Sequence, residues 1–182
     1  ERLSIAAISR VTDISETWLQ HYINKKYKQV PKQIEIAKKK APLRIECDEL
    51  WSFVQNKANK QWVWLAQDAS SREIVGVHIG KRDESGARGL WKSLPGVYRQ
   101  CAVSYTDFWA AYEKVFPGKR HKAVGKESGK TAHIERVNLT LRQRVGRLVR
   151  KTLSFSKKQA NHIGAIWEFV HHYNANIAPR LA

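Results

Sequence analysis

The sequence predicts an α/β fold in which a mixed sheet is flanked by helices and is preceded by a small helical segment. The pattern of hydrophobic residues indicates this class, because it follows helical spacing up to about residue 23 and alternates as in strands from Leu43 onward. Segments with strand-like and helix-like patterns then follow one another to about residue 174. With 182 residues, 42% of them hydrophobic, the chain is long enough for one well-buried core.

Residues 4–23 are expected to form two short helices around a tight turn, because Ile5, Ile8 and Val11 recur at helical spacing. Asp13 is expected to cap the second helix, with Glu16 placed for a capping box. The pair resembles a helix-turn-helix, whose second helix enters the DNA major groove. Asp13 stands where such motifs often carry glycine, a position that aspartate tolerates better than most residues. An ordinary helical hairpin is the alternative interpretation.

The remaining elements follow in a recognisable order. Three consecutive strands with short connections predict an antiparallel meander, and a helix, a strand and further helices come after it. The expected strands cover residues 43–54, 60–71, 72–81 and 101–107, and the expected helices cover 83–94, 131–151 and 159–174, with another beginning at 108. This β-β-β-α-β-α order is typical of a ribonuclease-H-like sheet. We therefore divide the chain into a helix-turn-helix-like DNA-binding segment (1–24), a basic linker (25–42) and a ribonuclease-H-like catalytic domain (43–182).

The charge of the chain indicates nucleic acid as a partner. The net charge is +17, from 33 Lys and Arg against 16 Asp and Glu. Between Lys119 and Lys158 there are 13 basic and 2 acidic residues, a more one-sided run than a solvated face needs. An anionic membrane is the other partner that such charge could serve, but without a long apolar run or a signal-peptide pattern we expect no membrane role. The sequence has no Met, even at position 1, and we expect it to begin inside a longer gene product.

Two isolated cysteines, Cys47 and Cys101, predict neither a zinc site nor a disulfide framework, and a reducing cytosol fits them. Both lie in apolar stretches that read as strands, where cysteines are commonly buried.

Three carboxylates stand out among the expected elements. Asp48 lies in the middle of the first strand on the face opposite Ile45 and Cys47, where a charge is costly to bury. Asp107 ends the fourth strand, which neighbours the first in a sheet of this order. Glu135 lies at the start of a strongly basic helix. The ordinary alternatives are a strand-edge charge, a helix cap and a first-turn acid favoured by the helix dipole.

The basic helix is expected to turn Glu135 toward the sheet. At 100° per residue an apolar stripe faces the sheet, and Glu135, Asn138 and Arg142 line its edge. The stripe consists of Ile134, Val137, Leu141, Val145 and Leu148. The polar and basic residues expected to bind DNA are Asn138, Arg142, Arg144, Arg147, Arg150 and Lys151.

Three convergent carboxylates would repel one another, by roughly 4 kcal/mol for a pair at ~4 Å and an effective dielectric near 20. A bound cation removes that cost, and oxygen ligands without a Cys and His cluster favour Mg²⁺ or Mn²⁺. Two such ions can activate a water or a 3′-hydroxyl for in-line attack on a phosphodiester. Glu46 and Glu49 are close to Asp48 in sequence; the face of the strand favours Asp48, although Glu46 shares that face.

Three sequence blocks resemble the insertion sequence one family of bacterial DDE transposases: "ECDELW", "YTDFWAAY" and "HIERVNLTLRQRVGRLVRKTLSFSK". The resemblance runs from about Arg44 to Tyr173. It implies a ribonuclease-H-like domain that cleaves and joins DNA strands with divalent metal, Asp48 and Asp107 as the two aspartates and Glu135 as the glutamate. Only 27 residues separate Asp107 from Glu135, fewer than in integrase relatives, which is consistent with a compact family.

The sequence thus predicts a bacterial transposase that binds the terminal inverted repeats of its element and a target DNA. By analogy we expect a homo-oligomer in the bacterial cytoplasm, associated with the nucleoid. Two alternatives remain: a nuclease of the same fold that never joins strands, and an inactive DNA-binding remnant or regulator.

Overall fold

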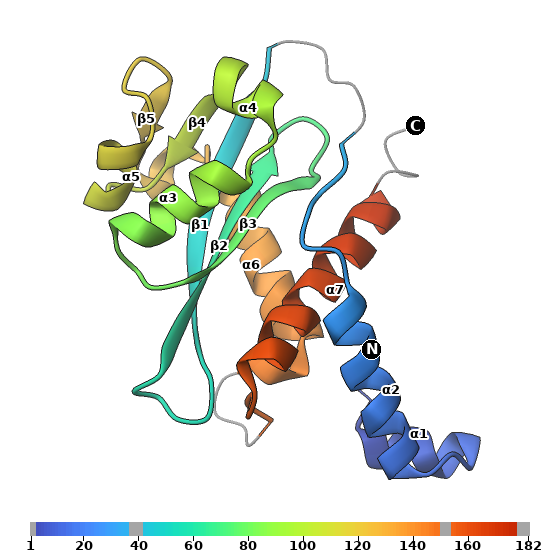
Figure 1. Cartoon of the computed structure of the whole chain (residues 1–182). Helices are drawn as coiled ribbons and strands as arrows, with labels where there is room; N and C mark the ends of the chain where they lie inside the picture. Colours follow the sequence, from blue (N-terminus) through green and yellow to red (C-terminus); the bar gives the residue numbers. More distant parts are fainter. Residues whose placement is uncertain (1–2, 37–41, 150–153, 178–182) are drawn as a thin grey trace.

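A five-stranded mixed sheet forms the centre of the computed structural model, which describes residues 3–36, 42–149 and 154–177 (Figure 1). The strands are β1 (Arg44–Phe53), β2 (Lys60–Asp68), β3 (Ile74–Gly80), β4 (Val103–Thr106) and β5 (His121–Ala123), in the order β3-β2-β1-β4-β5. The first three pair antiparallel, whereas β4 lies parallel to β1 and β5 parallel to β4. This is the predicted ribonuclease-H-like topology, with β1 and β4 as neighbours.

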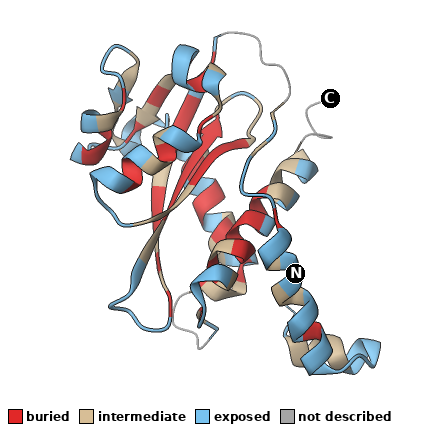
Figure 2. Cartoon of the chain, in the orientation of Figure 1, coloured by how far each residue is buried: buried red, intermediate tan, exposed pale blue. Residues whose placement is uncertain are grey.

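Helices cover both faces of the sheet. The helices of the sheet domain are α3 (Glu84–Ser93), α4 (Gly96–Cys101), α5 (Ala110–Val115), α6 (Ala132–Arg144) and α7 (Gln159–Ile177), with 3-10 turns η1 (Lys126–Ser128) and η2 (Gly146–Leu148). Each face buries its own hydrophobic core. Figure 2 shows buried segments in the strands and in the helices that cover them. One core lies between β1–β3 and α6–α7, and the other packs the opposite face against α3, α4 and α5.

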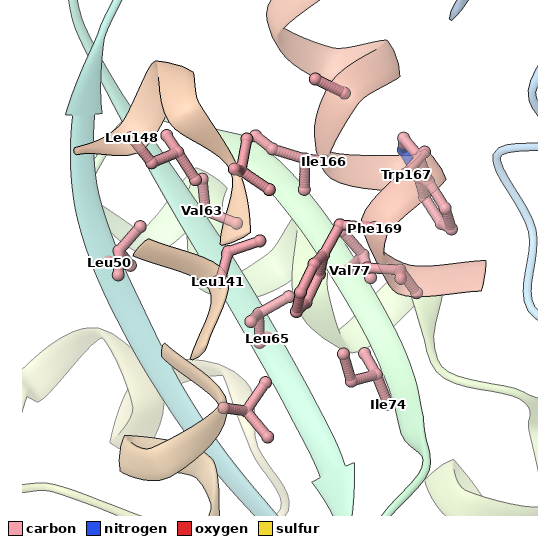
Figure 3. Packing of buried hydrophobic residues seen from close by; sticks show 14 of the residues in the cluster. Leu50, Val63, Leu65, Ile74, Val77, Leu141, Leu148, Ile166, Trp167 and Phe169 are labelled. Carbon is pink, nitrogen blue, oxygen red and sulfur yellow. The ribbon is translucent and has the colours of Figure 1, made fainter. Parts of the chain in front are cut away.

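The core beneath α6 and α7 contains the whole predicted apolar stripe, because Ile134, Val137, Leu141, Val145 and Leu148 are all buried. Figure 3 shows Leu141 and Leu148 packed with Leu50 and Val63 of the sheet. The expected single helix over 131–151 is nevertheless wrong in its second half. α6 ends at Arg144, and a 3-10 turn carries the last stripe residue into the core. Apolar burial therefore holds this segment in place after the helical hydrogen bonds stop.

Of the N-terminal helices α1 (Ile5–Thr12) and α2 (Glu16–Gln29), α2 lies beside α7 and α1 packs on α2 (Figure 1). Asp13 adopts the left-handed conformation expected of it, with φ 57°. The expectation that it caps α2 is wrong, because Ser15 is the N-cap and its hydroxyl accepts from the Trp18 backbone N–H. Helix α2 runs to Gln29, so the first part of the expected linker is helical.

Helix α2 is held against the sheet domain through α7. The Asn161 amide donates to Asn24 Oδ1 at 2.8 Å, and a Cβ added to Gly164 would lie 2.4 Å from the Tyr27 Cβ. Glycine therefore permits this close packing of α2 on α7.

Two short elements escaped prediction, namely α4 and β5. Cys101 was expected in a strand, but it ends α4 and is exposed; Cys47 is buried as expected. Asp83, at the start of the predicted helix 83–94, caps α3 by accepting from the Gly86 backbone N–H. Among the described helices, none combines the length and apolar character needed to cross a bilayer.

Candidate active site

Asp48 lies in the central strand of the sheet, on the face that α6 covers. Alternation along β1 separates it from Ile45 and Cys47, which pack into the other core. Two donors hold its carboxylate: Asn138 Nδ2 donates to Oδ2 at 2.8 Å, and the Glu49 backbone N–H donates to Oδ1 at 2.8 Å. The side chain is therefore fixed in orientation but not neutralised.

Asp107 follows the last residue of β4. The parallel register pairs Glu46 with Tyr105, so the same offset carried two residues further sets Asp48 beside Asp107. The Trp109 backbone N–H donates to Asp107 Oδ1 at 3.0 Å. Trp109 itself is the N-cap residue of α5, so Asp107 stands before the helix and does not occupy its cap. The predicted neighbourhood of the two aspartates follows directly from the β1–β4 pairing.

Glu135 lies in the first turn of α6, where the helix dipole favours a carboxylate. Its Oε1 accepts from the Thr131 hydroxyl at 3.2 Å. Glu135 is exposed, yet it lines the same cavity as the two aspartates. Sheet pairing and helix docking thus bring three acids that are remote in the sequence to one cavity. Glu135 nevertheless lies outside the group of described carboxylates whose oxygens are within 4.8 Å of one another.

The N-terminus of α6 is anchored by Glu46, which is buried. Glu46 Oε2 accepts from the backbone N–H groups of His133 and Ile134 at 3.0 and 3.1 Å, and Oε1 lies 2.6 Å from His133 Nδ1. A strand carboxylate therefore satisfies donors that the first turn of a helix leaves without intrahelical acceptors. Since Glu46 is only two residues from Asp48, this contact also sets the distance between β1 and the helix that carries Glu135.

A cavity of about 270 Å³ lies between these elements. Its lining combines the three predicted acids with neighbours from β1, α6 and the segment before α6. The lining residues are Cys47, Asp48, Asp107, Val124, Lys126, Thr131, Glu135 and Asn138. Because a water molecule occupies about 30 Å³ in the liquid, the cavity has room for cations with several waters.

Burial and neighbouring negative charge raise the pKa of Asp48 to about 6. Burial is the larger cause, Glu49 and Asp107 add like charge, and the hydrogen bonds from the Glu49 N–H and from Asn138 act in the opposite direction. Burial also raises the pKa of Glu49, against the lowering effect of Arg82. Burial and like charge therefore destabilise the ionised form of the carboxylates in and beside the cavity.

The donor set fits a hard divalent cation. One carboxylate oxygen from each of Asp48, Glu49 and Asp107 lies within 4.8 Å of the others. Asn138 Oδ1 is buried and accepts no hydrogen bond from any described residue, which leaves one more oxygen at this site that needs a partner. Cys47 offers no competing soft ligand, because burial raises the pKa of its thiol well above the usual range. Oxygen ligands alone favour Mg²⁺ or Mn²⁺.

The residues predicted to contact DNA fall into different environments. Asn138 is buried and holds Asp48, and Arg142 Nη2 donates to the Trp51 carbonyl at 3.2 Å. Arg144 is exposed at the end of α6.

Arg147, by contrast, is half-buried, with its guanidinium 5.6 Å from the ring centre of Tyr27. Arg150 and Lys151 lie outside the described residues. Of the predicted set, Arg144 is thus the described side chain most open to solvent.

Sequence reasoning missed three contributors to this region. Glu49 belongs to the acid cluster although it faces the other core, Lys126 lines the cavity, and Arg82 pairs with Glu49. The acidic run "ECDE" pointed to Glu49, but strand alternation argued against it. No sequence pattern around Lys126 or Arg82 pointed to the site, because Lys126 reaches it from a 3-10 turn and Arg82 from a loop, both remote from β1 in the sequence.

Comparison with known proteins identifies the family of this chain. A sequence profile described as IS1 transposase, of the DDE class, matches residues 42–174. The InsB protein of insertion element iso-IS1n from Shigella dysenteriae is 35% identical over 125 residues, 69% of this chain and 92% of that protein. The InsB protein of IS1 from Shigella flexneri is 36% identical over 130 residues, covering 70% of this chain and 95% of the relative. An InsB protein from Escherichia coli K12 is 35% identical over 130 residues, with 70% and 75% coverage. The chain belongs to the IS1 transposase family.

Proposed function

We propose that this chain cleaves the DNA ends of its insertion sequence and joins them to target DNA, with Asp48, Asp107 and Glu135 as ligands of Mg²⁺ or Mn²⁺. The observation that carries the proposal is that these three carboxylates line one cavity. Membership of a DDE transposase family supports the same chemistry. The raised pKa of Asp48 adds physical support, because a cation would relieve the repulsion that raises it.

The proposed reaction has two transfers at phosphorus. Water attacks the phosphodiester at the element end, the bond to the 3′-oxygen breaks, and a 3′-hydroxyl and a 5′-phosphate result. The new 3′-hydroxyl then attacks a target phosphodiester, forms the joint and releases a target 3′-hydroxyl. When bound, two divalent ions supply activation of the nucleophile and stabilisation of the leaving oxygen.

The protein's own side chains orient the acids of this site and place a positive charge beside them. Asn138 holds Asp48 through a 2.8 Å hydrogen bond, and Thr131 donates to Glu135. Lys126 lines the cavity beside the acids, so its ammonium group can meet a phosphate oxygen that enters there. No covalent link between protein and DNA is required, because water and the 3′-hydroxyl are the nucleophiles.

We further propose that the element's terminal inverted repeats and target DNA are the partners, bound largely through phosphate contacts. The net charge of +17 and the exposed Arg144 at the end of α6 support this proposal. Helices α1 and α2, with Asp13 in the left-handed turn between them, suit a helix-turn-helix role in reading the ends. Pairing of two ends calls for a homo-oligomer, and DNA as substrate places the protein on the bacterial nucleoid in the cytoplasm.

The test is a cleavage and strand-transfer assay with uncut and pre-cleaved duplexes that carry the element's terminal repeat, a plasmid target, and Mg²⁺ or Mn²⁺. We expect the wild type to give joined product, and Asp107→Asn to bind the same duplex without cleaving or joining it. Arg88→Ala is the matched control, because Arg88 is an exposed residue of α3 and pairs only with Glu84 among the described carboxylates.

Two outcomes would replace the proposal. Metal-dependent cleavage of uncut ends without any joined product would make the protein a nuclease of the same fold. Metal-independent binding without scission under any metal would make it a DNA-binding regulator or an inactive remnant.

A further inference from the structure

The three carboxylates whose oxygens lie within 4.8 Å of one another include Glu49 and do not include the proposed ligand Glu135. Glu49 offers an oxygen within 4.8 Å of those of Asp48 and Asp107, yet it does not line the cavity. Its side chain is only 1% exposed and lies on the face of β1 opposite Asp48. An ionised acid so close to a cation site either becomes a ligand or is held elsewhere by a partner.

Arg82 provides that partner from the loop between β3 and α3. Its Nε donates to Glu49 Oε1 at 2.7 Å and its Nη2 lies 2.6 Å from the same oxygen. The other oxygen of Glu49 accepts from the Tyr112 hydroxyl at 3.0 Å. Both oxygens of Glu49 are thereby occupied on the side of the sheet away from the cavity.

The guanidinium of Arg82 is itself fixed between two indole rings. Its Cζ lies 4.6 Å from the ring centre of Trp62 and 4.3 Å from that of Trp109. The backbone N–H of Trp109 donates to Asp107. One side chain therefore contacts both the competing acid and the turn that carries a proposed metal ligand. A planar guanidinium can stack and donate at once, whereas a lysine ammonium cannot.

We propose that Arg82 is a positioning residue of the active site, which withholds Glu49 from the cation and leaves Asp48 free to bind it. Through its stack on Trp109, Arg82 also holds the turn of Asp107. The inference rests on the proposed metal-dependent function, but its test uses metal binding by the protein alone. A failure of strand transfer in the wild type would therefore be seen separately.

The experiment measures Mn²⁺ binding at pH 8 by calorimetry and by the electron paramagnetic resonance of bound Mn²⁺, without DNA. We expect Arg82→Ala to bind Mn²⁺ several-fold more tightly than the wild type, because Glu49 is released toward the cation. In the strand-transfer assay the same variant should lose about 10- to 100-fold in kcat, the usual effect of removing a residue that orients a ligand, with little change in KM for the duplex. Arg82→Ala with Glu49→Gln should return Mn²⁺ affinity to near the wild-type value and recover part of kcat.

Two further variants keep the test decisive. Arg82→Lys preserves charge but not the stack, so Mn²⁺ affinity should stay near the wild type while kcat falls to an intermediate value. Arg88→Ala removes an arginine that pairs with Glu84 at the same 2.6 Å but in solvent, and it should change neither quantity. Unchanged or weaker Mn²⁺ binding in Arg82→Ala, or no restoration by Glu49→Gln, would overturn the inference. Circular dichroism identifies any variant that fails to fold, and Arg82→Lys then carries the test.

Discussion

The carboxylates on and beside β1 lie in two contrasting settings, one at the cavity and the other at its flanks. At the cavity, neither Asp48 nor Asp107 forms an ion pair with any described residue, although both stand close to like charge. At the flanks, Glu46 bonds to the start of α6 and Glu49 to Arg82 and Tyr112. The difference teaches that the acids that support the site are held by hydrogen-bond donors, whereas the aspartates that we propose for catalysis stand without a counter-charge among the described residues.

The largest expected effect is loss of a cavity carboxylate. Asp48→Asn should lower strand-transfer kcat by about 10³-fold or more, because it removes a proposed metal ligand whose role is to stabilise charge in the reaction. The metal-free protein should melt at the wild-type temperature or slightly above, since a repelling charge has gone. Melting curves with and without Mg²⁺ check this, and only the wild type should gain stability from the metal. An active Asp48→Asn would contradict the assignment.

Removal of a flanking acid should instead cost stability. Glu46→Ala leaves the buried N–H groups of His133 and Ile134 without an acceptor, and we expect a loss of about 2–4 kcal/mol in the free energy of unfolding. Glu46→Gln is the matched control, because its amide oxygen can still accept, and it should lose only about 1 kcal/mol. Urea denaturation measures both. Equal losses in the two variants would show that charge matters there more than the helix contact.

The pH dependence of stability should also distinguish the two settings. The pKa of Asp48 is raised in the folded protein to about 6, so the native state holds more protons than the unfolded state between about pH 4 and 6. Without metal, stability should fall by roughly 2 kcal/mol as pH rises through this window, once solvent screening is allowed for. Asp48→Asn should flatten that part of the curve. A wild-type curve that rises there would contradict the account.

The smallest effect should come from an acid that is paired but exposed. Arg88 and Glu84 form an i,i+4 pair on α3 at 2.6 Å, with side chains 53% and 47% exposed. Arg88→Ala should cost about 0.3–0.5 kcal/mol in unfolding free energy and leave strand transfer unchanged. A loss as large as that of Glu46→Ala would show that pairing alone, and not burial, sets the contribution of these acids.

Local patterns were sufficient for much of the site. Alternation along β1 put Asp48 on the helix-facing side, and helical periodicity identified the buried stripe from Ile134 to Leu148. The element order predicted that β4 would lie beside β1, and with it the position of Asp107. Local patterns were not sufficient for the extent of α6 or the cap of α2, because the end of a helix depends on which neighbouring group satisfies its last free backbone donors and acceptors.

By itself the sequence determined the pairing of the first four strands, the basic charge of the chain and the face of β1 that carries Asp48, because hydrophobic periodicity and charge are local properties of the sequence. Only the tertiary structure decided the partners of Glu46 and Glu49. Their contacts reach 87 residues along the chain to His133 and 33 to Arg82. Such pairs are chosen by the docking of whole elements, and no short stretch of sequence encodes which donor will arrive at a given carboxylate.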